Sequence, residues 1–360
     1  MINLGIIGCG RHTETVHLPV LRRFGEVRLY SACDTRDERL RLVKQVFGIP
    51  RLYDDWTRFM ADPGLDAVLI ATPGESHAPL AAAAIAAEKH VFVEKPFALT
   101  VADAEALAEK ARTARVVSMV GLNFRFHPLA GELKATIQRG AVGRPLAVFT
   151  TMMSGKSQRI TVTGYQTSPQ HGGGVFHDKA VHTIDLLRFL FDCEVVSGRV
   201  TGSSGLRQHD AAAVEMVLAN GVRVSGYFSS RAIPDMTFLI IGDEGKAMVN
   251  FARPTGVALY RQEFSRSRAA KLWAYLRQAP RITSAVRLST PAGRLSSYRS
   301  EWRHFLACIA SRTRPTPNFD DGLAVTRTVA QLIGSLSDPA DSCPDSVRAG
   351  LVGETSSGTE

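Results

Sequence analysis

Three polar residues stand where they could carry out chemistry on an alcohol or a carbonyl. Lys95 follows the apolar run Val91–Val93 and Glu94, so its ammonium group would lie beyond the end of a strand. Asp178 and His182 are four residues apart, a spacing that places both on one face of a helix. Histidine is the natural proton acceptor for an alcohol near neutral pH. The set therefore predicts proton transfer, with Lys95 stabilising charge that develops on oxygen.

The residues around His182 fit this interpretation. Asp185 follows His182 by three residues and is near enough to orient the imidazole ring. Glycines 172–174 precede the pair and would let a substrate or cofactor approach the backbone closely. An ordinary Asp–His pair at a helix cap is the structural alternative. No third or fourth ligand is evident beside Asp178 and His182, so we predict no metal site.

A glycine pair after the first apolar segment predicts a dinucleotide site. Gly8 and Gly10 permit a tight turn and let the backbone approach a pyrophosphate, with Arg11 and His12 next in line. Thr13 occupies the position where the full motif has a third glycine. We therefore expect looser packing of the first helix against its strand.

An acidic residue follows the second predicted strand at the place where a ribose would bind. The Asp34 carboxylate can accept bonds from ribose hydroxyls and would repel a 2′-phosphate, which favours NAD. Arg36 could accommodate that phosphate, so NADP stays open. Asp34 could also cap the helix that follows. Further along, the loop with Thr72, Pro73 and His77 should contact the nicotinamide half, although His77 could equally be a cap or a surface histidine.

The elements that must position these residues alternate in the first part of the chain. Helical patterns at 36–47 and 103–112 separate the strands, with Gly48 able to end the first helix and Thr100 a plausible N-cap of the second. Such alternation indicates a doubly wound parallel sheet, a Rossmann domain over residues 1–121. The predicted strands are 2–7, 27–33, 67–71, 90–94 and 116–120.

The later part indicates an α+β domain, residues 122–337, with a large and mostly antiparallel open sheet. Asn220-Gly221 predicts a hairpin between two of its strands, and helices should close the domain at 301–311 and 322–335. The polar tail 338–360 should be disordered. The strands are expected at 145–152, 195–202, 212–219, 222–230, 236–242 and 246–252.

Composition narrows the class of protein. The 360 residues carry a net charge of +9, and the segment 261–299 holds nine Lys or Arg against Glu263 alone, which accounts for nearly all of it. We interpret this segment as a solvated insertion; a site for a phosphorylated substrate or peripheral contact with an anionic membrane are the alternatives. Five scattered cysteines, no signal peptide and no membrane-length apolar run favour a cytoplasmic protein. We find no nucleic-acid-binding motif.

Taken in order, these motifs resemble the Gfo/Idh/MocA family of oxidoreductases over most of the chain. The resemblance is carried by Gly8–Gly10, His17–Pro19, Ala71–Pro73 with His77, Glu94–Pro96, Asn123–Pro128, Gly140–Gly143, Gly172–Gly174 with Asp178, His182 and Asp185, and Pro317–Gly322. Two residues depart from the pattern. Lys179 and Ala180 stand where the family commonly has an aliphatic residue and a glycine, and they could reshape the substrate pocket.

The resemblance implies hydride transfer between a nicotinamide cofactor and a secondary alcohol or ketone of a sugar, nucleotide sugar or cyclitol. It makes His182 the general acid/base, Asp178 a substrate ligand and Lys95 a residue that positions both substrate and cofactor. It also places Glu94 and Asn123 at the cofactor and Arg125 and Tyr165 at the substrate. Asn123 and Arg125 would lie near the floor of the cleft. Family members often form homo-oligomers, dimers or tetramers, through the open sheet.

Two other functions are compatible with the same residues. The first is redox-neutral chemistry, such as glycoside cleavage or epimerisation, in which NAD is transiently reduced and then restored. The second is a non-catalytic NAD(H)-binding sensor or partner subunit, which Lys179 and Ala180 keep open. The intact set of Lys95, Asp178 and His182 argues against a sensor, because a sensor needs no acid/base pair beside its cofactor.

Overall fold

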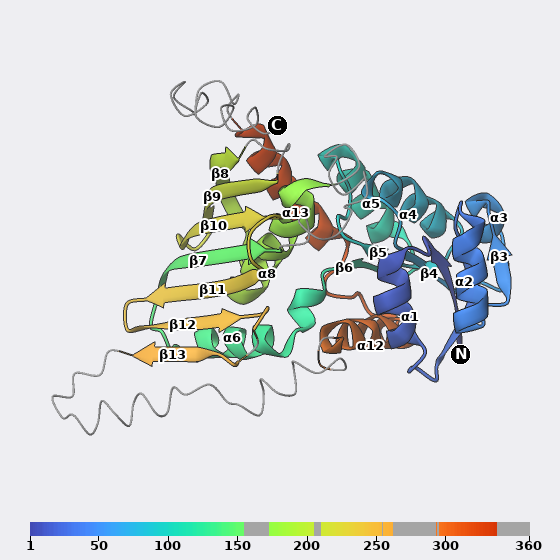
Figure 1. Ribbon diagram of the computed structural model, residues 1–360, viewed down its shortest axis with the longest axis horizontal. Helices are drawn as coiled ribbons and strands as arrows, with labels where there is room; N and C mark the ends of the chain where they lie inside the picture. Colours follow the sequence, from blue (N-terminus) through green and yellow to red (C-terminus); the bar gives the residue numbers. More distant parts are fainter. Residues whose placement is uncertain (155–172, 205–209, 254, 262–292, 294, 337–360) are drawn as a thin grey trace, which may run out of the picture.

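Two sheets of different construction divide the molecule (Figure 1). The computed structural model describes residues 1–154, 173–204, 210–253, 255–261, 293 and 295–336. Tyr165, Gly172, most of the basic segment and the tail from 337 lie outside this part, so the predictions for them are not tested. Among the described helices, none combines the length and the apolar character needed to cross a bilayer.

The first sheet is a parallel sheet of six strands in the order β3-β2-β1-β4-β5-β6. The order runs outward in both directions from β1 and β4, so the carboxyl ends of these two strands flank the switch point where ligands bind in such sheets. The strands are β1 (Ile2–Ile7), β2 (Val27–Cys33), β3 (Arg51–Tyr53), β4 (Ala67–Ile70), β5 (His90–Glu94) and β6 (Ser118–Gly121).

Helices cover both faces of this sheet, as the alternating pattern predicts. Gly48 ends α2 in the left-handed conformation, and the Thr100 hydroxyl caps α5 by accepting from the Asp103 amide, so both predicted helix ends are confirmed. The helical elements are a π-helical turn η1 (Thr13–His17), α1 (Leu18–Leu21), α2 (Asp37–Phe47), α3 (Trp56–Met60), the 3₁₀ turn η2 (Gly74–Ser76), α4 (His77–Ala86) and α5 (Val101–Thr113).

The second sheet has seven strands in the order β13-β12-β11-β7-β10-β9-β8. All neighbours are antiparallel except β7 and β10. Gly221 has a φ of 85° in the turn between β9 and β10, which confirms the predicted hairpin. The strands are β7 (Pro145–Met153), β8 (Val195–Ser204), β9 (Ala211–Leu218), β10 (Arg223–Ser229), β11 (Asp235–Gly242), β12 (Gly245–Asn250) and β13 (Ala258–Arg261).

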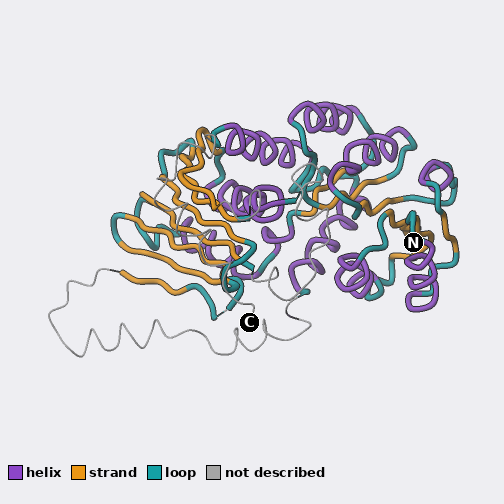
Figure 2. Tube along the Cα trace, turned by 45° about the horizontal axis from the view of Figure 1, so that its top comes forward, coloured by secondary structure: helices purple, strands orange, loops and turns teal. Residues whose placement is uncertain are grey.

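Residues of these strands alternate between a buried and an open face. In β10, Val224 and Phe228 are buried while Arg223 and Tyr227 are exposed. The helices of this half lie on the side of the sheet that faces the first sheet (Figure 2). They are η3 (Asn123–Phe126), α6 (Pro128–Gln138), the π-helical turn η6 (Phe176–Ala180), α8 (Val181–Phe191) and α13 (Phe319–Gly334).

One late helix packs against the first sheet. Helix α12 (Ser296–Ser311) lies beside α1 in Figure 1, and its Trp302 and Phe305 are fully buried against residues of β1, β4 and β5. Trp302 stacks on Phe92 with ring centroids 4.4 Å apart. The cofactor half therefore depends on a helix that begins about 175 residues beyond its last strand. The boundary at residue 121 stays a prediction.

The predicted fold class is confirmed, with a parallel Rossmann sheet followed by a mostly antiparallel sheet. Each strand predicted from sequence is present with its ends shifted by at most two residues. Two strands were missed, β3 and β13. Both are short edge strands of three and four residues, too brief to show an alternating pattern.

Candidate active site

The glycine turn after β1 has the geometry of a phosphate-binding loop. Gly8 adopts a φ of +90°, and a Cβ there would lie 2.6 Å from the carbonyl oxygen of Ala71. Only glycine fits such a position without moving the backbone of the neighbouring strand. Among the residues that the structure describes, no atom lies within 4 Å of the Cβ position of Gly10, and Arg11 after it is exposed. The turn thus leaves open space in front of the first helical element.

Thr13, in place of the third glycine, is fully buried and holds the turn together. Its hydroxyl donates to the Gly8 carbonyl oxygen at 2.6 Å. The residues from Thr13 to His17 form a π-helical turn, which is wider than an α-helical one. The wider turn accommodates the Thr13 side chain, and the looser packing of the first helix on its strand stays a prediction.

Asp34 links the glycine turn to the second strand. Its carboxylate accepts from the amide of Cys9 at 2.8 Å and from the amide of Arg36 at 2.9 Å, and it is almost fully buried. The Arg36 guanidinium lies 3.4 Å away and is half exposed. These bonds hold the carboxylate at the edge of the opening in front of the turn.

A cavity of about 450 Å³ opens at this point. It has a glycine floor, a carboxylate on one side and the loop after β4 on the other, which are the features that the adenosine end of a dinucleotide requires. The residues present therefore fit NAD. The lining includes Gly8, Gly10, Asp34, Arg36, Thr72 and Pro73.

The sequence predicts that the loop containing His77 contacts the nicotinamide half of the cofactor, but the structure places the His77 side chain in the protein interior. Its side chain is almost fully buried, with Nδ1 2.7 Å from the carbonyl oxygen of Pro96 and Nε2 2.8 Å from that of Thr72. Burial lowers the pKa of His77, and the neutral ring can donate to only one carbonyl at a time. His77 thus ties the loop after β4 to the segment after β5, while Thr72 and Pro73 line the cavity.

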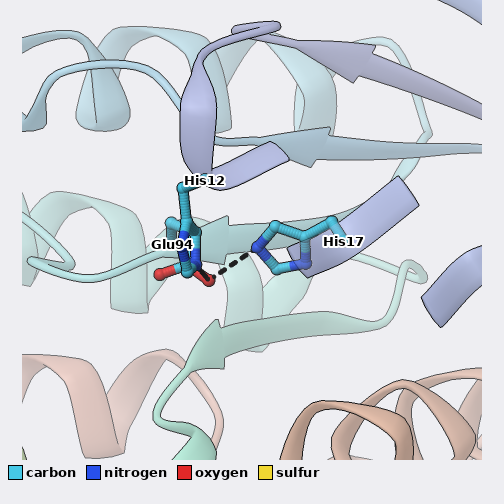
Figure 3. A group of neighbouring side chains, drawn as sticks. All are labelled: His12, His17 and Glu94. Atoms are coloured by element: carbon cyan, nitrogen blue, oxygen red, sulfur yellow. Dashed lines mark hydrogen bonds and ion pairs between the residues drawn. The ribbon is translucent and has the colours of Figure 1, made fainter. Parts of the chain in front are cut away.

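Glu94, the last residue of β5, is held by two histidines (Figure 3). His17 Nε2 lies 2.9 Å and His12 Nε2 3.4 Å from the same carboxylate oxygen. The other oxygen accepts from the amide of Lys95 at 3.1 Å. A Cβ on Gly121 of β6 would lie 3.0 Å from this carboxylate, so a larger residue there would press on the Glu94 side chain.

The tautomer of His17 follows from its other neighbour. The indole nitrogen of Trp302 lies 3.0 Å from Nδ1 of His17 and can only donate. Nδ1 of His17 is therefore the acceptor, and its Nε2 carries the proton that is donated to Glu94. Burial would raise the pKa of Glu94, but the hydrogen bonds from His12 and His17 hold it well below its usual range. His17 thus links Trp302 and Glu94 in a chain of hydrogen bonds. Because its Nε2 carries a proton, that nitrogen is not available to bind a metal.

Lys95 reaches from the first sheet to the second half of the molecule. Its ammonium lies 2.7 Å from Oδ1 of Asp178, and Lys179 Nζ lies 2.5 Å from Oδ2. Asp178 stands on the π-helical turn η6 that precedes α8. Burial would raise the pKa of Asp178, but the two lysines hold it well below its usual range. The predicted pair of Lys95 and Asp178 is thus brought into direct contact.

His182 lies one turn beyond, near the start of α8, and its ring packs edge-on against Phe124 with centroids 4.9 Å apart. Burial, reinforced by the charge of Lys95, lowers its pKa to about 3. The imidazole is therefore neutral near pH 7, which is the form that accepts a proton. Asp178 precedes it on the adjoining helical turn, as the spacing predicts.

The expectation that Asp185 orients His182 is wrong. Asp185 is buried and binds Arg125, whose Nε and Nη2 lie 2.9 and 2.6 Å from its carboxylate. Within the described residues, Nδ1 of His182 has no hydrogen-bond partner. The carboxylate faces the guanidinium because an arginine fork matches two carboxylate oxygens, and a buried acid needs such a partner.

The same pairing determines the environment of Arg125. Its guanidinium is 7% exposed and also contacts Asp321, which in turn contacts Arg188. These ion pairs join the segment after β6 to α8 and α13, so Arg125 helps to hold α8, the helix that carries His182, in place. This geometry does not favour its predicted contact with substrate. Asn123 is likewise buried, and its amide donates to the Ser297 hydroxyl at 3.2 Å.

Sequence reasoning assigned no role to His17 or Trp302. His17 could have been found, because His17–Pro19 belongs to the motifs that carry the family resemblance. Trp302 gives no such signal, since its bond to His17 spans 285 residues. Lys179 was recognised only as a departure from the family pattern.

Two domain descriptions of one family match this chain. The oxidoreductase family with an NAD-binding Rossmann fold, GFO_IDH_MocA, matches residues 2–122, and the GFO/IDH/MocA C-terminal domain matches residues 131–248. Together they cover the first sheet, most of the second sheet and the elements that carry Lys95, Asp178 and His182.

Individual dehydrogenases are also similar to this chain in sequence or in fold. Myo-inositol 2-dehydrogenase of Thermotoga maritima is 27% identical over 334 residues, which are 89% of this chain and 92% of that protein. The NAD⁺-dependent scyllo-inositol 2-dehydrogenase of Bacillus subtilis is 28% identical over 270 residues, 72% of this chain and 76% of that protein. A levoglucosan dehydrogenase solved with NADH and levoglucosan superimposes with a TM-score of 0.78 at 24% identity, over 93% of this chain and 96% of that one, and shows the shared fold.

Proposed function

Because the chain belongs to the GFO/IDH/MocA family of oxidoreductases, we propose that it is an NAD-dependent dehydrogenase of sugar-like alcohols. The reaction is hydride transfer between the nicotinamide and a secondary alcohol or ketone of a sugar, nucleotide sugar or cyclitol. One observation carries the proposal: Lys95, at the end of a strand in the cofactor half, contacts Asp178, one helical turn before His182. The dehydrogenases of inositol and apiose among its relatives support the substrate class.

Each member of the set has a distinct role in alcohol oxidation. NAD, when bound, supplies the acceptor for the hydride. His182 is neutral at pH 7 and accepts the hydroxyl proton. The Lys95 ammonium stabilises negative charge that develops on the substrate oxygen, and Asp178 holds Lys95 and binds a neighbouring hydroxyl.

The cofactor half explains a preference for NAD. Asp34 is fixed by two backbone amides at the edge of the cavity, where it would accept from the hydroxyls of the adenosine ribose. The 2′-phosphate of NADP would be repelled by the buried carboxylate at this position. Arg36 is half exposed and bonded to Asp34, so it is less able to bind such a phosphate.

We further propose that the protein acts in the cytoplasm as a homo-oligomer that associates through the open face of the second sheet. Phe149 of β7 is 48% exposed, Tyr227 of β10 42% and Met248 of β12 37%. Leu239 of β11 pairs with both Phe149 and Met248, which makes an apolar row across four strands with Ala258 of β13. Apolar surface of this kind is typical of subunit interfaces.

The function can be tested by titrating the protein with NADH and NADPH and then adding sugars, cyclitols and nucleotide sugars while following absorbance of the reduced nicotinamide. We expect tighter binding of NADH and substrate-dependent redox change. Tight binding with product formed but no net redox change would point to the redox-neutral enzyme. Tight binding with no reaction would point to a sensor, and no binding of either cofactor would contradict the proposal.

A further inference from the structure

A second cavity lies at the edge of the first sheet opposite the active site. Its volume is about 860 Å³, nearly twice that of the cavity in front of the glycine turn. It opens where β5 begins at His90 and where β6 begins at Ser118. The active site lies at the other ends of these strands, which are five and four residues long, so about 10–13 Å of strand separates the two places.

This second cavity, the edge cavity, combines an apolar wall with a basic rim. Val116, Ile309 and Phe319 contribute to the wall, from the approach to β6, from α12 and from the start of α13. A volume of this size falls in the range of about 300–1,000 Å³ that is typical of small-molecule sites, which also combine apolar walls with a few polar groups. The rim carries Arg112, Arg115, Arg312 and Arg314.

Two of the four arginines are fixed by ion pairs. Arg112 lies 2.8 Å from Oδ1 of Asp320, the second residue of α13, and Arg314 binds the other oxygen of the same carboxylate. Arg112 also pairs with Glu109, one turn earlier on α5, at 2.5 Å. These contacts hold two guanidinium groups in place beside the cavity.

The other two arginines are not engaged in this way. Arg115 and Arg312 are exposed, and within the described part of the chain neither guanidinium makes a hydrogen bond or an ion pair. Glu88 is the acid among the described lining residues, and His90 is neutral near pH 7 because burial lowers its pKa. With Glu109 and Asp320 counted, the described charges of the cavity are four positive and three negative. A ligand with one anionic group would balance them.

A buried hydroxyl provides an independent observation. Ser118 lines the edge cavity and is 5% exposed, and among the described residues its hydroxyl has no hydrogen-bond partner. Buried hydroxyl groups are nearly always hydrogen-bonded in folded proteins, because an unsatisfied one costs free energy. A polar atom of a bound molecule would satisfy this group.

We propose that the edge cavity is a second binding site, for a small organic anion with an apolar body and one carboxylate or phosphate group. Guanidinium groups suit both kinds of anion, because their planar fork donates two parallel hydrogen bonds. Val116, Ile309 and Phe319 would cover the apolar body. No residue of this site takes part in the proposed hydride transfer, so the inference is independent of the dehydrogenase function.

An NMR titration of the NADH-saturated, ¹⁵N-labelled protein tests the proposal. The probes are phenyl phosphate and benzoate, which carry the same ring and the two kinds of anionic group. Inorganic phosphate lacks the ring, and phenol lacks the carboxylate or phosphate group. We expect at least one of the two ring anions to bind with a Kd of about 1 mM or below, and inorganic phosphate and phenol to bind at least about tenfold more weakly.

The positions of the shifts show where a probe binds. The proposal predicts that the largest changes occur at the amides of Val117, Ser118 and Thr313, which line the edge cavity. Changes confined to Gly8 and Gly10 would place the probe in the dinucleotide cavity and contradict the proposal. Absence of shifts at the edge cavity with about 10 mM of either ring anion would also overturn it. If inorganic phosphate binds as tightly as phenyl phosphate, the apolar wall is not used and the proposal is likewise wrong.

Variants separate ligand binding from a purely structural role of the arginines. The double variant Arg115→Met/Arg312→Met removes the two unpaired guanidinium groups and should raise the Kd of the ring anion at least about tenfold. Arg199→Met is the control, because it removes an exposed arginine of β8 in the other half of the molecule and should leave this Kd unchanged. NADH titration and thermal unfolding verify that both variants fold.

A structural role would give a different result. Arg312 is the C-cap of α12 and Arg115 lies just beyond the end of α5, where a cation also stabilises the helix dipole. If the double variant unfolds at a lower temperature but binds the probe with unchanged Kd, the arginines only stabilise these helix ends and the proposal is wrong.

Discussion

The cofactor half and the substrate half of this site are assembled in different ways. In the cofactor half, the decisive contact joins Cys9 of the glycine turn to Asp34, which are 25 residues apart in one strand–helix–strand unit. In the substrate half, Lys95 meets Asp178 across 83 residues. A contact of the same long range, from Trp302 of α12 to His17 across 285 residues, supports the cofactor half. Local contacts recur as a motif, whereas long-range contacts depend on how the two sheets are brought together. The contact between the glycine turn and Asp34 should therefore tolerate changes elsewhere in the chain better than the contact between Lys95 and Asp178.

The largest effect should come from the substrate half. His182→Ala removes the proton acceptor, and turnover should fall by about two to four orders of magnitude, the usual contribution of a general acid/base. Steady-state kinetics with the best substrate measures the loss, and NADH titration reports on the cofactor half separately. A loss below threefold would assign proton transfer to another group.

A smaller effect is expected in the cofactor half. Asp34→Asn keeps an oxygen for the Cys9 amide but loses the charge that accepts from ribose hydroxyls. The Kd for NADH should rise by about 10- to 100-fold, with NADPH affected less, because hydrogen bonds to charged groups contribute about 1.5–3 kcal/mol. Fluorescence titration measures both. Asp37→Asn, at an exposed position on α2, is the control and should leave both constants unchanged. Equal weakening of NADH and NADPH would contradict the ribose contact.

The hydrogen bonds from Trp302 to His17 and from His17 to Glu94 should give a smaller effect again. Trp302→Phe keeps a ring against Phe92 but removes the donor to His17 Nδ1. We expect kcat/KM to fall by about three- to tenfold, the value of one neutral hydrogen bond. The ¹⁵N shift of His17 Nδ1 should move because this nitrogen loses its donor, whereas Nε2 keeps the proton that it donates to Glu94. Phe305→Leu, which changes packing on the same helix face without touching the hydrogen bond, should lower stability and leave that shift as it is. A mixture of His17 tautomers in the unaltered protein would contradict the chain of hydrogen bonds from Trp302 through His17 to Glu94.

The smallest effect concerns stability against pH. Burial lowers the pKa of His127 to about 4, and its neutral Nδ1 accepts from the Leu129 amide at the start of α6. Between the ordinary histidine pKa and this value, the unfolded chain binds a proton that the folded chain refuses, so stability falls as pH decreases from about 6.5 to about 4. His127→Asn keeps a good N-cap and should flatten part of this dependence in urea unfolding at pH 7 and pH 5. An identical pH dependence in the variant would show that His127 does not contribute.

The same contrast determines how much could be predicted from sequence. The glycine turn, Asp34 and the strand ends were accessible because each depends on neighbours within one βα unit. Lys95, Asp178 and His182 were identified as residues, but their contacts follow from the packing of two domains. Asp185 was paired with the wrong residue because His182 is its neighbour in sequence, whereas Arg125 is its partner in space. The packing of α12 against the first sheet could not be predicted, because no pattern in the sequence indicates which sheet this helix covers.

The most direct test of the account is the structure of this protein with NADH and an oxidisable sugar-like alcohol. The account predicts that the adenosine ribose contacts Asp34 and that one substrate carbon lies about 3–3.5 Å from the hydride-carrying atom of the nicotinamide. The oxygen on that carbon should lie about 2.6–3.2 Å from His182, with Lys95 beside it. A nicotinamide that points away from His182, or a substrate oxygen out of reach of both side chains, would contradict it.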